Sequence, residues 1–173
     1  MLPLALASCG GGEANRNGAA VTALPSPAAT AQPAATPAPK PQPVTATAEE
    51  VKLDAGGSGE ASVRLDIAQG FHTHANPASD KFYIPTELRA EASEGVTPGK
   101  PVYPPGKPLK LAFSDKPLLL YEGSVVIRLP LRADKAAAKG RHTLRARLHV
   151  QHCNDEQCFP PRDIDAPIPV NIN

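Results

Sequence analysis

The sequence predicts an all-β protein, an antiparallel β-sandwich preceded by a disordered Pro/Ala-rich tether. Apolar and polar residues alternate with a period of two from about residue 49 onward, as in strands with one buried face. Clusters of Gly and Pro, such as Pro104-Pro105-Gly106, separate these runs. Before residue 49 the composition is dominated by Gly, Ala, Pro, Thr and Gln, with few large apolar side chains.

The predicted domain covers residues 49–173 and contains about seven short strands, a number typical of a sandwich. We expect weaker strands over residues 86–92 and 109–113, and no more than a turn or two of helix over residues 133–139. A domain of this size should fold without help from a disulfide. The clearest alternation occurs over residues 61–67, 125–131, 144–150 and 164–172.

Three prolines fall on the polar phase of these predicted strands: Pro130, Pro167 and Pro169. Proline has no N–H to donate to a neighbouring strand, so in sheets it is confined mainly to edges. We therefore expect the strands that contain these prolines to be edge strands.

Residues 10–48 are predicted to be a disordered linker. So few large apolar side chains cannot offset the entropy lost on ordering the chain. The prolines bias such a segment toward extended polyproline II conformations. We expect the linker to act as a spacer without specific contacts.

The segment Leu6-Ala7-Ser8-Cys9 closes a short apolar run and resembles the lipobox of bacterial lipoproteins. Residues 1–9 are therefore interpreted as the remnant of a lipoprotein signal, with Cys9 as the lipidation site and sole membrane contact. No Lys or Arg precedes the apolar run, so the positive region of the signal is expected upstream of Met1. The predicted location is periplasmic and lipid-anchored, and Gly10 favours the outer membrane. The alternative is an incidental cysteine in a disordered tail.

The other two cysteines, Cys153 and Cys158, lie on a predicted hairpin with four residues between them. A bridge between them would close a ring of about six residues and contribute roughly 2 kcal/mol, against nearly 5 kcal/mol for a loop of about 100 residues. Such a bridge can open without unfolding the domain. Cys153 is out of phase with the apolar positions that precede it, so we expect the hairpin to carry it toward solvent.

Two acidic residues, Asp155 and Glu156, lie between the cysteines, and their negative charge should raise the thiol pKa. This pair is then better suited to being attacked by a partner's thiolate than to attacking. Such chemistry is typical of an electron relay or a substrate and not of an autonomous oxidase.

Several motifs precede the cysteine hairpin in a fixed order. They are Gly70-Phe71-His72-Thr73-His74-Ala75-Asn76-Pro77, Ile84-Pro85-Thr86, Tyr103-Pro104, Phe113-Ser114-Asp115 and Leu120-Tyr121-Glu122-Gly123, followed by Cys153-Asn154-Asp155-Glu156-Gln157-Cys158-Phe159-Pro160-Pro161. With these motifs, nearly all of residues 50–173 resembles the N-terminal periplasmic domain of the transmembrane disulfide reductase DsbD, in a free-standing or differently fused form.

The resemblance implies an immunoglobulin-like antiparallel β-sandwich with Cys153 and Cys158 as the redox pair. In this family the pair accepts electrons from a membrane-embedded thiol reductase and passes them to periplasmic thioredoxin-fold proteins. In this family a cap loop with an aromatic ring shields the pair. Here that loop would run from Phe113 to Tyr121, with Phe113 as the cap. We expect the electron donor to be a separate protein, and the direction of transfer stays open.

Four side chains are predicted to cap the disulfide or contact a partner: Phe113, Tyr121, His72 and His74. Phe113 and Tyr121 are alternatively core residues, and Phe82 and Tyr83 are predicted to be core. The alternative role for His72 or His74 is packing beside the hairpin with a hydrogen bond to the backbone.

Two other functions stay open. One is a copper- or zinc-binding lipoprotein in which His72, His74 and His152 act with Cys153. The other is a non-catalytic immunoglobulin-like interaction module with an inert disulfide. The net charge of +1 gives no field suited to nucleic acid, so we expect no nucleic-acid partner, and no cofactor is expected.

Overall fold

The computed structural model describes residues 42–173, and within them the chain forms fourteen strands and no helix. Cys9 and the part of the predicted linker up to residue 41 lie outside the described residues. The strands are β1 (Val44–Ala48), β2 (Val51–Leu53), β3 (Ser58–Ile67), β4 (His72–His74), β5 (Glu87–Ala90), β6 (Val96–Pro98), β7 (Lys107–Leu109), β8 (Leu118–Tyr121), β9 (Ser124–Ala133), β10 (Gly140–Leu144), β11 (Ala146–Val150), β12 (His152–Cys153), β13 (Arg162–Asp165) and β14 (Ile168–Ile172).

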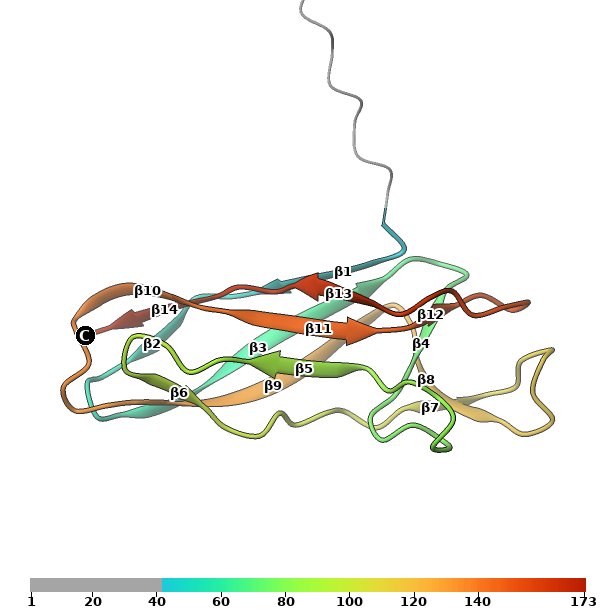
Figure 1. Ribbon diagram of the computed structural model, residues 1–173, viewed down its shortest axis with the longest axis horizontal. Coiled ribbons are helices and arrows are strands. Elements are labelled where there is room, and N and C mark those ends of the chain that lie inside the picture. The colour runs from blue at the N-terminus through green and yellow to red at the C-terminus, as the bar shows by residue number, and fades with distance from the viewer. Residues whose placement is uncertain (1–41) are drawn as a thin grey trace, which may run out of the picture. The chain divides into compact units, whose positions relative to one another are not determined.

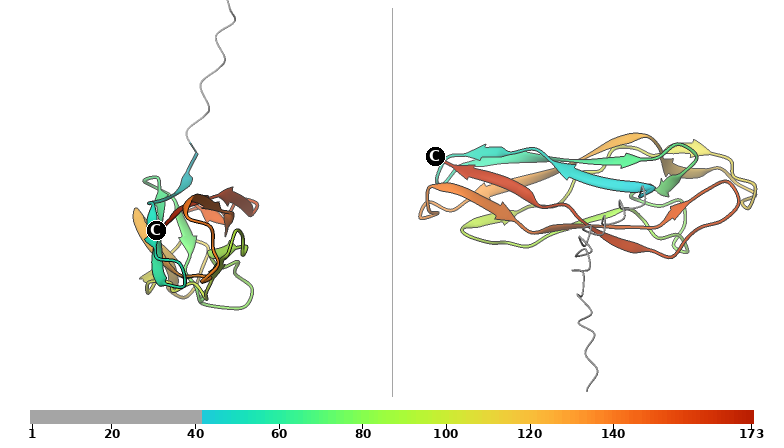
Figure 2. Two further views of the ribbon diagram at one scale, coloured as in Figure 1. Left: turned by 90° about the vertical axis from the view of Figure 1, so that its left-hand side faces the viewer. Right: turned by 90° about the horizontal axis from the view of Figure 1, so that it is seen from above.

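These strands form the predicted β-sandwich. Hydrogen bonding links them in the orders β1-β3-β9-β6, β10-β14-β2, β13-β11-β5 and β12-β4-β8-β7. Figure 1 shows β5, β11 and β13 lying over the long strands β3 and β9, and Figure 2 shows the layered arrangement from the end and from above. Neighbouring strands pair antiparallel, apart from β2 and β14, which pair parallel. The prediction of an all-β sandwich is confirmed.

The core lies between the layers and follows the period-two pattern of the sequence. β3 and β9 pair from Ser58 opposite Arg132 to Asp66 opposite Ser124, and their inward-facing residues are buried. Each strand has one apolar face, and stacking the two sheets removes the apolar faces of both sheets from water. The main cluster includes Ala61, Val63, Leu65, Ile67, Ile127, Leu129, Leu131, Leu144, Leu148 and Ile168.

The ordered domain begins earlier than the sequence predicts. Residues 44–48, which we assigned to the linker, form β1 and pair with β3 from Val44 opposite Ile67 to Ala48 opposite Val63. Val44 is buried in the main cluster. This pairing supplies backbone hydrogen bonds and apolar burial that the local composition does not reveal.

The other local predictions are confirmed in one case and corrected in the rest. The weak strand expected over residues 86–92 is present as β5, but the one expected over 109–113 is shifted to β7, which ends at Leu109. Residues 133–139 contain no helix. The prolines do not mark edges in β9 and β14, because each of these strands lies between two neighbours.

In both strands the proline coincides with the end of one pairing. β6 stops at Pro98, opposite Leu131, so the ladder ends beside Pro130. β2 pairs with β14 from Val170 onward, just past Pro169. The missing N–H of each proline is tolerated because a ladder ends next to it.

The cysteine pair lies at one end of the sandwich, on the sheet β12-β4-β8-β7. The segment that follows β12 and the loop between β7 and β8 project from this same end in both views (Figures 1 and 2). A small second cluster packs there around Leu111, Leu118 and Leu120, and it is separate from the main core. Among the described residues no helix has the length and hydropathy needed to span a bilayer.

Candidate functional site

The hairpin that carries the cysteines is held by one asparagine. The N–H of Asn154 donates to the carbonyl of Gln157 at 2.9 Å. Its side-chain Oδ1 accepts from the N–H groups of Glu156 at 3.1 Å and Gln157 at 2.8 Å. Asparagine favours this position because its side chain can replace a backbone acceptor in a tight turn. The turn brings Cys153 and Cys158 directly opposite each other.

The two cysteines form a disulfide with its sulfur atoms in different environments. The Sγ–Sγ distance is 2.01 Å and the Cα atoms are 3.9 Å apart. Cys153 is fully buried, whereas Cys158 is exposed. The prediction that Cys153 points to solvent is therefore wrong. Its backbone pairs with His72 of β4, which turns its side chain into the domain. A partner thiolate can reach the bridge from the Cys158 side.

Two histidines of β4 lie behind the buried sulfur. His72 and His74 are 2% and 0% exposed, so they cannot contact a partner in this state of the domain. The Nε2 atom of His74 lies 4.0 Å from Sγ of Cys153, and its ring stacks on Tyr83 with centroids 4.5 Å apart. The alternative prediction was that these histidines pack beside the hairpin and hydrogen-bond to the backbone. The packing is present, but among the described residues neither ring has the expected hydrogen bond to the backbone. Within the described residues, Nδ1 of His74 and Nε2 of His72 have no partner.

Both imidazoles are neutral at pH 7. Burial lowers the pKa of His74 from 6.5 to about 4, and the neighbouring His72 adds to this shift. Burial also lowers the pKa of His72, an effect that Asp155 and Glu122 partly oppose. The site therefore offers no positive histidine to stabilise a thiolate at Cys153.

The opposite face of the hairpin carries a cluster of three rings, of which only His152 was predicted to take part in the site, as a possible metal ligand. His152 stacks on Phe159 with ring centroids 4.7 Å apart and an interplanar angle of 7°. Phe71 packs against both rings at 5.8 and 6.2 Å. Paired residues in a hairpin alternate between faces, so this cluster backs the disulfide without covering it. The signal available in the sequence was the position of His152 and Phe159 immediately outside the cysteines.

The other predicted contact residues have different environments. Phe113 is 41% exposed and lies in the loop between β7 and β8, so its role as a cap stays a prediction. Tyr121 is 3% exposed; its hydroxyl donates to the carbonyl of Pro104 at 2.7 Å and accepts from the N–H of Asn76 at 3.2 Å. It is a core residue that ties two loops. Phe82, predicted to be core, is 82% exposed.

One group of possible metal ligands occurs at the site. The donor atoms of His74, Cys153 and Cys158 lie within 4.8 Å of one another. His72 and His152, the other histidines considered as ligands, are not part of this group. His152 extends from the opposite face of the hairpin, where it stacks on Phe159.

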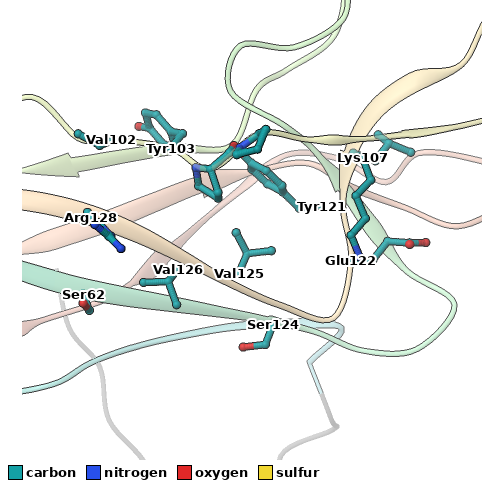
Figure 3. Close-up of a pocket in the computed structure, with 13 residues that line it drawn as sticks. Ser62, Val102, Tyr103, Lys107, Tyr121, Glu122, Ser124, Val125, Val126 and Arg128 are labelled. Carbon is teal, nitrogen blue, oxygen red and sulfur yellow. The ribbon is translucent and has the colours of Figure 1, made fainter.

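A cavity of about 620 Å³ lies away from the disulfide, between the segment that contains Val102 and Pro105 and the strands β8 and β9 (Figure 3). Its lining includes Tyr103, Tyr121 and Val125, and it contains neither cysteine of the bridge. The cavity is therefore separate from the disulfide.

Comparison with known families agrees with this geometry. The family described as "Thiol:disulfide interchange protein DsbD, N-terminal" matches residues 38–167. The chain belongs to this family. Its membership and the Cys153–Cys158 disulfide support thiol–disulfide interchange as the general function.

Several solved structures match this chain at low sequence identity. The N-terminal periplasmic domain of ScsB from Proteus mirabilis is 16% identical with a TM-score of 0.49, and the match covers 72% of this chain and 44% of that one. The reduced N-terminal domain of DsbD from Neisseria meningitidis is 19% identical with a TM-score of 0.42, covering 68% and 82%. A chain of a cohesin–dockerin complex from Clostridium thermocellum is 11% identical with a TM-score of 0.40, and the match covers 75% of this chain and 94% of that one. The chain thus spans less than half of the ScsB structure. The comparison with curated proteins finds no match.

The first prediction concerns stability in acid. The pKa of His74 is lower in the folded state, so between pH 6.5 and about 4 the unfolded chain binds more protons. The stability that depends on a neutral His74 is complete above pH 6.5 and is lost as the pH falls toward 4, by on the order of 3 kcal/mol. Urea unfolding of the disulfide form between pH 7.5 and 4 should show this loss.

The variant His74→Phe is the control for this measurement, because it keeps a ring against Tyr83 and removes the titrating group. His142, whose pKa is raised mainly by Glu94, acts in the opposite direction in both proteins and cancels in the difference. Equal slopes of unfolding free energy against pH in the two proteins would contradict the prediction.

The second prediction concerns the turn. Asn154→Ala removes two hydrogen bonds worth about 1 kcal/mol each, so the cysteines are held less firmly in the bridging position. The reduction potential should become less negative by about 20–40 mV. Equilibration with glutathione or a dithiol buffer measures the shift. Gln157→Ala is the matched control, because Gln157 contributes main-chain groups to the turn; a similar shift in both variants would show that the Asn154 side chain is not responsible.

Proposed function

We propose that this chain relays electrons by thiol–disulfide interchange between a membrane-embedded thiol reductase and thioredoxin-fold proteins outside the cytoplasm. The observation that carries this proposal is the disulfide at the hairpin, with the sulfur of Cys158 exposed and that of Cys153 buried. Family membership supports the type of chemistry. The identity of both partners is part of the proposal.

The exposure of the two sulfurs gives the exchange an order. A partner thiolate attacks Sγ of Cys158, the Sγ–Sγ bond breaks, and Cys153 leaves as a thiolate that takes up a proton. The partner's second thiolate then attacks its own sulfur in the mixed disulfide and releases Cys158. The partner dithiol is oxidised to a disulfide, and the chain's disulfide is reduced to a dithiol. The reverse sequence passes the electron pair to the next protein.

The disulfide can open without loss of the fold because it lies outside the main core. Neither cysteine belongs to the main hydrophobic cluster, which is built on β3, β9, β11 and β14. The bridge joins residues five positions apart and does not connect the two layers. A short ring of this kind contributes only about 2 kcal/mol.

We further propose that Cys9 carries lipid and that the proline-rich segment after it tethers the domain to a bacterial membrane facing the periplasm. The lipobox-like segment Leu6-Ala7-Ser8-Cys9 supports the anchor, and Gly10 favours the outer membrane. Membership of the DsbD N-terminal family supports a compartment outside the cytoplasm. An extended tether lets an anchored domain reach partners along the membrane.

The relay is tested by trapping its mixed disulfide. In a Cys9→Ser background, Cys153→Ser leaves the exposed Cys158 able to bond a partner and removes the thiol that would resolve the bond. A disulfide-linked complex with a thioredoxin-fold protein should accumulate in cells and be identified by mass spectrometry.

The matched variant Cys158→Ser leaves the buried Cys153 and should trap much less. Equal trapping by both variants would contradict the proposed order of attack. Absence of a thioredoxin-fold partner from both would contradict the relay.

The effect of reduction on stability separates the relay from an inert structural bridge. Reducing the pair should lower the free energy of unfolding by no more than about 2 kcal/mol, because the ring is short. Thermal melts of the oxidised and reduced chain measure this change. A loss of cooperative unfolding on reduction would identify the bridge as structural.

A further inference from the structure

The reduced cysteines and one histidine converge on a point suited to a metal ion. We propose that His74, Cys153 and Cys158 form a Cu(I) site that exists only when the disulfide is reduced. This site rests on the reversibility of the disulfide proposed above. It adds to the relay a second use of the same sulfurs.

The geometry of the buried half of the site is already close to that of a coordination sphere. Ligand bonds of about 2.3 Å to sulfur and 2.0 Å to nitrogen, about 120° apart, place the two donor atoms roughly 3.7 Å from each other. Nε2 of His74 and Sγ of Cys153 are 4.0 Å apart. An ion could therefore bind both atoms with a small adjustment.

The ring of His74 is held in place, but no hydrogen bond at Nδ1 fixes its tautomer. Its ring stacks on Tyr83, and its strand β4 pairs with both β8 and β12. Nδ1 has no hydrogen-bond partner among the described residues, so no acceptor fixes the proton on one nitrogen. Nε2 can therefore present its lone pair toward the sulfur.

The exposed cysteine supplies the movement that the site requires. In the disulfide the sulfurs are 2.01 Å apart, too close to be separate ligands. After reduction, rotation of the exposed Cys158 side chain can open this distance while Cys153 and His74 stay in place. Binding Cu(I) then releases the two thiol protons, and no electron moves in this step.

The donor set favours Cu(I). Two thiolates and one imidazole are soft donors, which select Cu(I) or Zn(II) over harder ions. Structural Zn(II) is almost always four-coordinate, whereas this group has three donors among the described residues, two of them fully buried. Because Cu(I) binds the dithiol and not the disulfide, it should hold the pair reduced and block exchange with partners.

The test uses the full chain with Cys9→Ser, reduced by a phosphine under anaerobic conditions. Cu(I) is supplied from a competing chelator of known affinity. We expect one Cu(I) per reduced chain and none for the oxidised chain. X-ray absorption should show two sulfur ligands and one nitrogen ligand. Because this measurement needs no further substitution, it does not depend on the folding of a variant.

The histidine assignment is tested with two matched variants. His74→Phe should lower the Cu(I) affinity at least about tenfold, whereas His72→Phe, which changes an equally buried neighbour outside the donor group, should leave it unchanged. Three results would overturn the proposal: equal Cu(I) affinity of His74→Phe and the parent, Cu(I) binding by the oxidised chain, or a Cu(I) coordination sphere without nitrogen. Zn(II) binding as tight as Cu(I) would overturn the choice of metal.

Failure of the relay and failure of the metal site give different results. If a thioredoxin dithiol cannot reduce the pair but the phosphine-reduced chain binds Cu(I), the relay is wrong and the metal site stands. If exchange with thioredoxin proceeds and the reduced chain binds no Cu(I), only the metal site is overturned.

Discussion

The pairing of β12 with β4 is the constraint on which the site depends. It consists of two residue pairs, His152 with Thr73 and Cys153 with His72. A shift of one residue would turn the side chains of β12 to opposite faces, with Cys153 outside and His152 against His74. The stacked rings of Phe71, His152 and Phe159 on one face and the Asn154 turn at the tip hold this register. The asymmetry of the two sulfurs follows from it.

The domain separates its stability from its chemistry. The main core is built by the long pair β3 and β9 with the facing strands, and the cysteines lie beyond it at one end. A smaller cluster around Leu118 and Leu120 supports the end that carries the site. Opening a bridge between residues five apart therefore changes the local hairpin and leaves the packed layers in place.

The strands that could be predicted best from the sequence are those in which apolar and polar residues alternate. β3, β9 and β11 alternate cleanly, because each has one buried and one exposed face. β4 has three buried residues and therefore no alternation, so its histidines could be recognised only by resemblance. β1 was missed because its alternating residues are small and follow a run of prolines. Its order comes from pairing with β3, which lies far from it in the sequence.

The burial of Cys153 could not be predicted by extending the pattern of β11. The apolar phase of that strand ends at Val150, and the chain then leaves β5 and β13 to pair with β4. This change of sheet resets the phase at Gln151, so the next buried side chain is Cys153 and not His152. The phase of a strand predicts burial only as long as its partners stay the same.

The neutral state of His74 connects the two proposed uses of the sulfurs. A protonated imidazole beside Cys153 would stabilise a thiolate and make the pair a stronger nucleophile. Burial holds the pKa of His74 near 4, so at neutral pH the ring gives the sulfur no such help and the chain depends on a partner thiolate for exchange. The same neutral ring keeps a lone pair next to the sulfurs, which is what a soft metal ion needs. A single buried residue thus makes the pair passive in exchange and gives it a third ligand once reduced.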